Sequence, residues 1–217
     1  MHRILIATFC FFTLTGCKHD SGYMLAHRTI AIQPMDNIPE TEIALLRKHL
    51  KQFFKTDVAV NQRSATPPHY FNYQKGKRGA ATKILDWLED KRTEPATLVL
   101  GITNHDIFTA KKDSTGNVKQ PESTYKIWGI FGLARVPGNT CVVSTARLQA
   151  TKKGQLEKRT ATVAIHEIGH SLGLKHCATK GCIMSDANEH ISTIDHNKGD
   201  YCHKCNLRIG RKFKHVK

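Results

Sequence analysis

Two histidines four residues apart, with a glutamate beside the first, are the residues of this chain best suited to chemistry. Residues 161–174 read ATVAIHEIGHSLGL. On a helix, His166 and His170 lie about 40° apart around the axis and one turn apart along it, so both imidazoles can bind one metal ion. Glu167 lies about 60° from His170, where it can reach a metal-bound water without binding the metal. The pattern H-E-x-x-H predicts hydrolysis in which the metal lowers the pKa of the water and Glu167 takes its proton.

A third histidine extends this pattern. Gly173 and His176 complete H-E-x-x-H-x-x-G-x-x-H. Glycine can adopt a positive φ and end a helix sharply, so the chain can turn back and bring His176 to the same ion. Three neutral imidazoles leave a fourth position open for water, as in a catalytic zinc site. From the composition, this pattern arises by accident about once in ten thousand chains, so ordinary surface histidines on a helix are a weak explanation.

Cysteines follow the histidines in two close pairs. They form, with a methionine between them, the pattern C-x4-C-x-M-x17-C-x2-C, made by Cys177, Cys182, Met184, Cys202 and Cys205. Four thiolates in two close pairs suit a closed tetrahedral zinc site. Disulfides are the alternative, because thiols outside the cytoplasm can oxidise.

The run from His166 to Cys205 resembles the archaemetzincin family of metallopeptidases. It matches that family's pattern at every fixed position, and LVLGIT, IFGLA and VVSTARL upstream are similar to the family's strands. The resemblance covers about residues 26–212 and implies a zinc metallopeptidase that acts on a peptide or protein substrate. It also implies that Met184 is the Met-turn residue, an apolar floor beneath the imidazoles. The four cysteines would hold a structural zinc beside the catalytic one, so we expect two Zn²⁺ per chain rather than disulfides.

The resemblance also implies a fold. This is the α/β (α+β zincin-like metzincin) fold: a twisted mixed sheet with two helices, an active-site helix over about 158–174, and a small zinc-stapled C-terminal subdomain over 175–217. The residues themselves indicate strands interleaved with helices in layers. Hydrophobic patterns predict strands over 27–33, 57–60, 96–103, 126–136 and 141–148, helices over 41–55 and 80–91, and loops over 61–79 and 109–124.

Two of these strands carry further expectations. By analogy with the family, strand 126–136 would be the sheet edge above the cleft, where a peptide could add as an extra strand; an interior strand is the alternative. Cys141 lies in an apolar strand outside the paired cysteines, so we expect it to be a small buried hydrophobe.

The first residues have the composition of a secretion signal. A basic start at Arg3 is followed by an apolar run of about eleven residues, which is too short for a permanent transmembrane helix. The run ends Leu-Thr-Gly-Cys, which resembles the lipobox of bacterial lipoproteins. We therefore expect a signal peptide over 1–16, lipidation of Cys17, a tether over 17–25 and a peptidase domain over 26–217. A buried first strand that happens to end in Gly-Cys is the alternative.

This signal predicts where the protein acts. A lipid on Cys17 would anchor the domain to a membrane of the bacterial cell envelope, and Lys18 resembles the outer-membrane sorting class. The chain has 217 residues, 40% of them hydrophobic, and a formal charge of +15. This composition excludes a disordered chain and a polytopic membrane protein. The positive charge favours anionic surfaces, but the basic residues lack interleaved aromatics, so we do not expect nucleic-acid binding.

The sequence thus favours a monomeric, membrane-anchored zinc metallopeptidase. The first alternative is a non-catalytic zinc-binding lipoprotein that binds peptides or metal; Glu167 argues against it, because a pure binding site has no use for that carboxylate. The second alternative is a zinc-ribbon nucleic-acid binder built from Cys177–Cys205 and the basic tail, which a salt-dependent gel shift would reveal.

Overall fold

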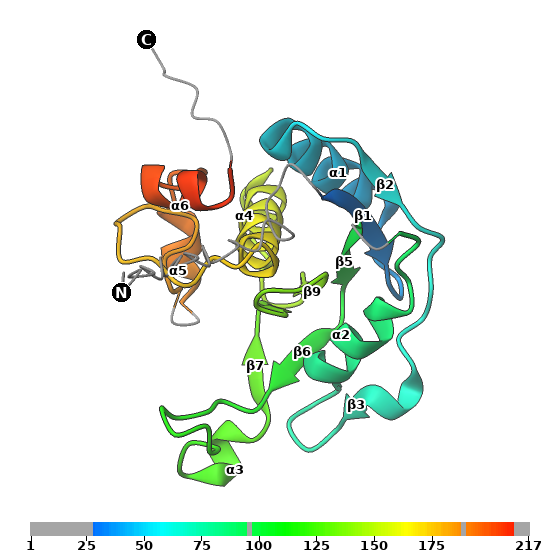
Figure 1. Ribbon diagram of the computed structural model, residues 1–217. Coiled ribbons are helices and arrows are strands. Elements are labelled where there is room, and N and C mark those ends of the chain that lie inside the picture. Colours follow the sequence, from blue (N-terminus) through cyan, green and yellow to red (C-terminus); the bar gives the residue numbers. More distant parts are fainter. Residues whose placement is uncertain (1–27, 95–96, 188–189, 211–217) are drawn as a thin grey trace, which may run out of the picture.

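A five-stranded sheet covered by helices on both faces forms the body of the protein. The computed structural model describes residues 28–94, 97–187 and 190–210. A smaller four-stranded sheet extends from one end of the body (Figure 1). The C-terminal helices lie against a different side of the body, next to α4. In the part of the chain that is described, no helix is long and apolar enough to cross a membrane. The expected signal peptide, Cys17 and the tether lie outside the described residues.

The larger sheet is mostly parallel. Its strands run in the order β2 (Val58–Val60), β1 (Thr29–Pro34), β5 (Thr97–Thr103), β9 (Thr140–Ser144) and β8 (Gly132–Ala134). The first four are parallel to their neighbours, and β8 alone pairs antiparallel, against β9. All seven residues of β5 are buried, as expected for a central strand covered on both faces. The expected mixed sheet is therefore confirmed.

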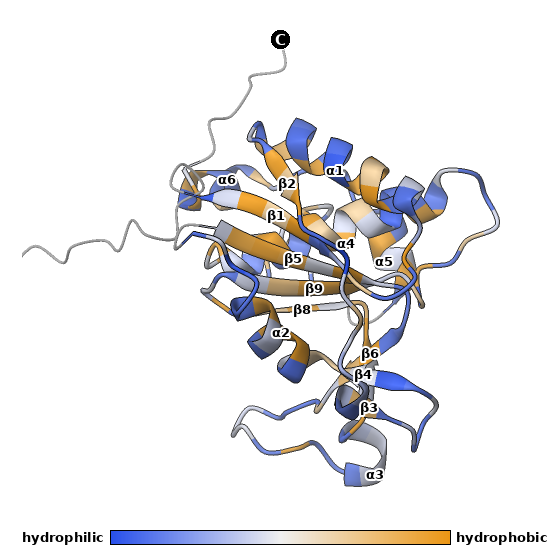
Figure 2. Ribbon diagram, turned by 90° about the vertical axis from the view of Figure 1, so that its right-hand side faces the viewer, coloured by the Kyte–Doolittle hydropathy of each residue, from blue (hydrophilic) through white to orange (hydrophobic). Residues whose placement is uncertain are grey.

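Alternate residues of the central strands face different helices. Leu100 and Val143 belong to the core under α1 (Glu40–Phe54) and α4 (Gln155–Ser171), whereas Val99 packs under α2 (Ala81–Glu89) on the opposite face. Figure 2 shows the apolar strands enclosed between these helices, with hydrophilic residues on the outer side of α1. The predicted helices 41–55 and 80–91 are confirmed as α1 and α2. The three expected strands before residue 104 are confirmed as β1, β2 and β5.

Two segments that were predicted to be loops contain regular structure in or next to the smaller sheet. This sheet consists of β3 (Phe71–Asn72), β4 (Arg78–Ala80), β6 (Asp106–Thr109) and β7 (Trp128–Ile130), in that order. The expected loop 61–79 contains a 3-10 turn at Pro68–Tyr70, β3 and the start of β4, and the expected loop 109–124 contains the start of α3 (Glu122–Tyr125). These strands have two to four residues each, which is too short for a hydrophobic alternation to reveal them.

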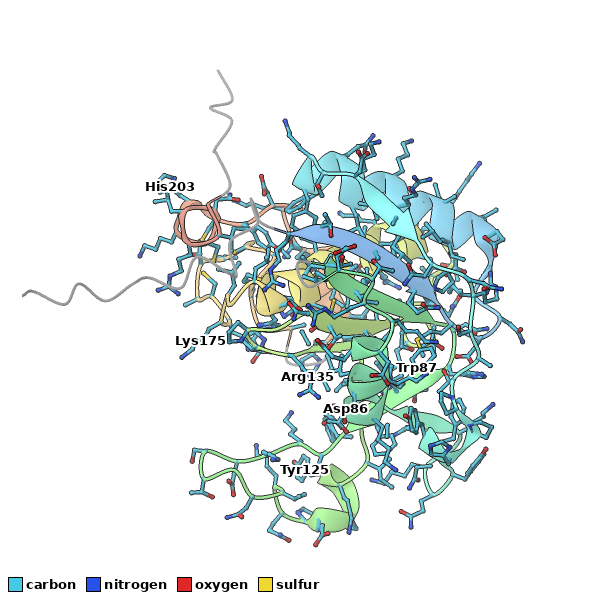
Figure 3. The ribbon with its side chains drawn as sticks, turned by 45° about the vertical axis from the view of Figure 1, so that its right-hand side comes forward. Asp86, Trp87, Tyr125, Arg135, Lys175 and His203 are labelled. Carbon is cyan, nitrogen blue, oxygen red and sulfur yellow. The ribbon has the colours of Figure 1, made fainter. Side chains whose placement is uncertain are left out.

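The predicted strand 126–136 is wrong as a single strand. It divides at Phe131 into β7, which pairs with β6 of the smaller sheet, and β8, which pairs with β9 of the larger sheet. The expected edge position is confirmed for β8, which ends the larger sheet. Beyond β8, Arg135 forms an ion pair with Asp86 of α2, and Figure 3 shows these two side chains next to each other.

The strand expected over 141–148 is shorter than predicted. It ends at Ser144, and the chain then turns, with the Leu148 amide donating to the Thr145 carbonyl at 3.0 Å. Leu148 still packs in the core, which explains why the apolar pattern extends past the strand. Cys141 is fully buried in β9, as predicted.

The C-terminal part contains α5 (Ile191–Asp195) and α6 (His203–Arg208) and packs against α4. The buried Tyr201 hydroxyl donates a hydrogen bond to the Ile165 carbonyl of α4 at 2.6 Å. On the same helix, Arg159 forms an ion pair with Asp195 of α5. These contacts fix the C-terminal part against the helix that carries His166 and Glu167.

Candidate active site

The active-site helix ends at a glycine, as the sequence predicts. Helix α4 runs over Gln155–Ser171, about three residues earlier than expected, and Gly173 has a φ of 89°. The Gly173 amide donates to the His170 carbonyl at 2.8 Å, and the Leu174 amide donates to the Gly169 carbonyl at 2.9 Å. These two hydrogen bonds form a Schellman motif, which needs a residue that tolerates positive φ. The motif reverses the chain and returns it toward the helix.

This reversal brings the three histidines together. The ring centroids of His166, His170 and His176 lie 4.6, 4.9 and 5.3 Å apart, and one nitrogen from each ring falls within 4.8 Å of the other two. His166 and His170 project from one face of α4, and His176 approaches from the segment after the turn. The predicted histidine cluster is therefore formed by the fold.

Backbone carbonyls orient two of the imidazoles. His166 Nδ1 lies 2.7 Å from the Ile183 carbonyl oxygen, and His170 Nδ1 lies 2.7 Å from the Leu174 carbonyl oxygen. A carbonyl only accepts, so each Nδ1 donates, and the lone pair of each neutral ring is on Nε2. This is the arrangement in which a histidine presents Nε2 to a metal while its other nitrogen is fixed from behind.

The third imidazole has a carboxylate beside it. His176 Nδ1 lies 3.5 Å from Asp186 Oδ2, and both side chains are about half exposed. Sequence reasoning missed Asp186, because a single aspartate two residues after Met184 matches no metal-binding pattern. Its position suits it to orient the neutral His176 ring through Nδ1.

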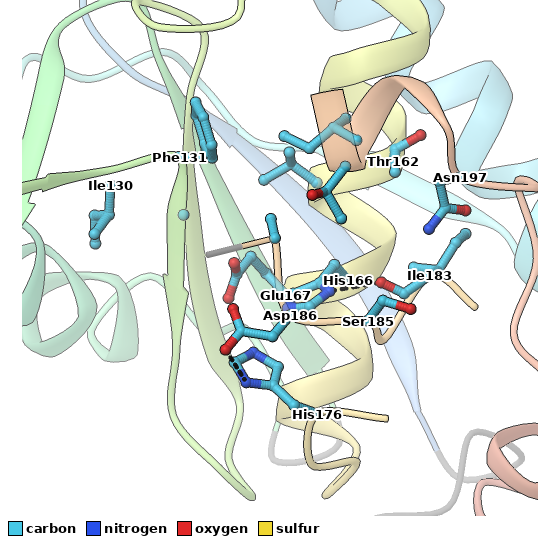
Figure 4. Close-up of a pocket in the computed structure, with 15 residues that line it drawn as sticks. Ile130, Phe131, Thr162, His166, Glu167, His176, Ile183, Ser185, Asp186 and Asn197 are labelled. Atoms are coloured by element: carbon cyan, nitrogen blue, oxygen red, sulfur yellow. Dashed lines mark hydrogen bonds and ion pairs between the residues drawn. The ribbon is translucent and has the colours of Figure 1, made fainter. Parts of the chain in front are cut away.

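Glu167 lies beside the cluster and is buried. The residue is 7% exposed, and burial raises the pKa of its carboxyl to about 8. The edge strand β8 passes directly over it: a Cβ at Gly132 would stand 2.7 Å from both Cγ and Oε1 of Glu167. Figure 4 shows Glu167 between this strand and the histidine-bearing helix. The absence of a side chain at Gly132 therefore allows Glu167 to occupy this place. Sequence reasoning missed Gly132.

Met184 packs beneath the helix turn that separates the two helical histidines. It is fully buried, and a Cβ at Gly169 would stand 2.5 Å from its sulfur and 2.9 Å from the Tyr201 hydroxyl. The position between Ile168 and His170 must therefore be glycine for Met184 and Tyr201 to approach the helix. The role of Met184 as an apolar floor beneath the imidazoles stays a prediction.

The four cysteines converge at a second place. Cys177 Sγ lies 3.7 Å from Cys202 Sγ, Cys182 Sγ lies 3.9 Å from Cys205 Sγ, and all four sulfurs fall within 4.8 Å of one another. A tetrahedral zinc with Zn–S bonds of about 2.3 Å places its sulfurs about 3.8 Å apart, so this set fits zinc. None of the five described cysteines is in a disulfide. The residues fit the structural zinc site expected from the sequence.

Backbone amides support two of these sulfurs. The Cys202 amide donates to Cys182 Sγ at 3.2 Å, and the Thr179 amide donates to Cys177 Sγ at 3.4 Å. Amide donors stabilise the thiolate form, which is the form that binds metal. The Cys177 amide also donates to the Met184 carbonyl at 2.8 Å, which links this cluster to the floor of the histidine site.

A cavity of about 130 Å³ opens next to the histidines. Glu167, His166 and His176 line it on one side, and Phe131 and the first residue of β8, Gly132, line it on the other (Figure 4). The rest of its lining comes from α4 and the C-terminal part and includes Thr162, Ile183, Ser185, Thr193 and Asn197. The imidazoles, the Glu167 carboxyl and the start of β8 therefore border one cavity.

Comparisons with known proteins agree with this geometry. The sequence profile of Peptidase family M54 matches residues 41–211. The chain belongs to Peptidase family M54. The archaemetzincin of Methanocaldococcus jannaschii is 29% identical over 184 residues, which covers 81% of this chain and 89% of that protein.

Solved structures extend the likeness to the fold. The archaemetzincin from Methanopyrus kandleri superposes with a TM-score of 0.67 at 25% identity, covering 85% of this chain and 95% of that one. The archaemetzincin from Archaeoglobus fulgidus, solved as a complex with malonate, superposes with a TM-score of 0.66 at 27% identity, covering 83% of this chain and 99% of that one. This M54 chain is a zinc metallopeptidase of the archaemetzincin family, with two side-chain clusters that fit metal.

Proposed function

We propose that this M54 peptidase hydrolyses peptide bonds at the histidine cluster, with His166, His170 and His176 as the ligands of a catalytic zinc and Glu167 as the catalytic base. The observation that carries the proposal is the convergence of three imidazole nitrogens within 4.8 Å, beside a buried carboxyl that faces the same cavity. When bound, zinc would supply a Lewis acid that lowers the pKa of a water molecule and polarises the scissile carbonyl.

The chain's own residues would handle the proton. The Glu167 carboxylate would take one proton from the attacking water as the C–O bond forms, and would then deliver that proton to the leaving amine as the peptide C–N bond breaks. Burial raises the pKa of Glu167 to about 8, and the charge of a nearby divalent cation would favour the carboxylate form that this role requires. The edge strand β8 would hold the substrate backbone, because a peptide can pair with its free side.

We also propose a structural zinc held by Cys177, Cys182, Cys202 and Cys205. The four sulfurs come from two short segments of the C-terminal subdomain, one carrying Cys177 and Cys182 and the other carrying Cys202 and Cys205 at the start of α6. A metal that joins the two segments would keep Tyr201 and Met184 against α4 and so keep the histidine site in shape. The total would be two zinc ions per chain.

The location of the enzyme is a separate proposal. We propose that Cys17 is lipidated after removal of residues 1–16 and anchors the monomeric peptidase to the bacterial cell envelope. The support is the sequence alone: a basic start, an apolar run and Leu-Thr-Gly-Cys. Metabolic labelling of whole cells with a clickable fatty acid tests it, because Cys17→Ser should abolish labelling; label on that variant would contradict the proposal.

The catalytic proposal is tested with the purified mature protein. Glu167→Gln should abolish hydrolysis of a broad peptide library while two zinc ions per chain remain by elemental analysis. Glu157→Gln, a glutamate at the start of the same helix, is the matched control and should retain turnover. Wild-type turnover by Glu167→Gln would remove the assigned role. A wild-type protein that binds zinc and peptides but hydrolyses nothing, in every member of the library, would favour the non-catalytic lipoprotein.

A further inference from the structure

A second cavity adjoins the active-site cavity. It is open, has a volume of about 770 Å³, and lies over the C-terminal subdomain. Ser185, Thr193 and Asn197 line both cavities, so these three residues form the wall that the two have in common. The two cavities are therefore neighbours.

The second cavity is basic. Lys180, His196 and Lys198 line it, and none of the described residues that line it is acidic. Within the described residues, neither lysine forms an ion pair. The stem of Lys198 packs over Gly181, where a Cβ would stand 2.8–3.1 Å from its Cγ, Cδ and Cε atoms. The lysine stem is therefore held by packing, while its ammonium group is available to a ligand.

Two acidic side chains that are adjacent in the sequence to lining residues of this cavity are engaged elsewhere. Asp186 lines the active-site cavity instead and lies against His176. Asp195 accepts two hydrogen bonds from Arg159, at 2.7 and 2.8 Å. The positive charge of the cavity is therefore not cancelled by either of these carboxylates.

The wall between the two cavities is fixed in place. Asn197 Nδ2 donates to the Cys182 carbonyl at 2.9 Å, and its Oδ1 accepts from the Gly199 amide at 2.8 Å. The Ser185 hydroxyl donates to the Thr179 carbonyl at 3.1 Å. These bonds tie Ser185 and Asn197 of the wall to the loop that carries Cys177 and Cys182.

We infer that the second cavity is a specificity subsite that binds a carboxylate of the peptide substrate. The carboxylate would come from an acidic side chain or from the C-terminus of the peptide, and Lys180 and Lys198 would recognise it by charge. The inference rests on the proposed function, because it assigns a preference to the same peptidase site. Such a subsite would make the enzyme selective for peptides with a carboxylate at one position. The net positive charge of the protein alone would favour anions of every kind.

The test measures binding without turnover. The zinc-loaded Glu167→Ala variant is titrated into fluorescent alanine heptapeptides, blocked at both ends, that carry Glu, Gln or Lys at one position at a time. A second set has a free C-terminal carboxylate in place of the amide. We expect Glu at one position, or the free carboxylate, to bind about fivefold more tightly than its neutral counterpart, and this ratio to fall as salt is added.

Variants on the same background assign the effect. Lys180→Gln combined with Lys198→Gln should bring the ratio to about one, and Lys180→Glu combined with Lys198→Glu should favour the Lys peptides. Lys48→Gln combined with Lys83→Gln removes the same charge from exposed positions on α1 and α2 and should leave the ratio unchanged.

The outcomes separate the two possible sources of the carboxylate. A preference for Glu at one position identifies a side chain, and a preference for acid over amide identifies the C-terminus. Equal binding of all peptides, or a preference that survives loss of both lysines, overturns the subsite. Because these ratios are measured without turnover, absence of hydrolysis by the wild-type enzyme would contradict the proposed function and not this inference.

Discussion

The contact between Gly132 and Glu167 gives the most direct test of how the fold positions the catalytic base. Gly132→Ala places a Cβ 2.7 Å from Cγ and Oε1 of Glu167, whereas ordinary contact begins at 3.4 Å. The carboxyl or strand β8 must therefore move by about 0.7 Å, and both belong to the proposed site. The Glu167 carboxyl is buried and β8 is paired with β9, so neither can move freely into solvent. The displacement therefore changes the alignment of the base.

The structure gives the size of the effect. A displacement approaching 1 Å in a catalytic group costs about 100-fold in rate, so we expect kcat to fall by about two orders of magnitude. Overpacking of this kind also lowers stability by about 1–3 kcal/mol. Zinc content should be unchanged, since no histidine lies among the three atoms nearest to the new methyl group.

A double-mutant cycle isolates the contact. Glu167→Ala removes Cγ, Cδ and Oε1, which are the three atoms nearest to the new Cβ. In that background Gly132→Ala should cost less than about 0.5 kcal/mol, as measured by denaturant unfolding. Two results would refute the reasoning: wild-type kcat in the zinc-loaded Gly132→Ala variant, or the same loss of stability in both backgrounds.

Two further predictions concern the metal sites. Burial lowers the pKa of His166 to about 4 and also lowers the pKa of His170. Because a proton on Nε2 prevents metal binding, the histidine site should retain zinc during acidification to about pH 5. Zinc measured after dialysis across pH 4–8 checks this, and half-release at or above pH 6.5, the ordinary histidine pKa, would contradict it. Cys205→Ser should lose one zinc of two and lower the Tm by more than 5 °C, since Cys205 is buried in the subdomain core. Full zinc content in that variant would mean that the sulfurs do not bind it.

The sequence predicted the residues of the site because their spacing is local. His166 and His170 lie on one face because of the period of a single helix. Gly173 predicts the turn after that helix, which brings His176 back to the other two histidines. The cysteine pairs have the same local character, because each pair lies within one short segment. The long helices α1 and α2 and the buried strand β5 were also predictable, since a continuous hydrophobic pattern runs through each.

Other parts of the site were not visible in the sequence, because they depend on contacts between distant segments. Asp186 matters only because the chain places it beside His176. Gly132 matters because β8 crosses Glu167, 35 positions away in the chain, and the exchange of sheets at Phe131 that brings it there leaves no periodic pattern. The basic second cavity likewise forms from Lys180 and Lys198 only when their segments fold together.

The sequence alone thus determined the chemistry: which side chains can bind metal, which carboxylate can move a proton, and which four thiols form a set. Those properties depend on residue type and on spacings of a few residues, which one helix or one turn converts into geometry. The tertiary structure decided what surrounds that chemistry, namely the glycine that makes room for Glu167, the carbonyls that fix the imidazoles and the cavities that a substrate can enter. These depend on packing between segments far apart in the chain, and no local pattern carries that information.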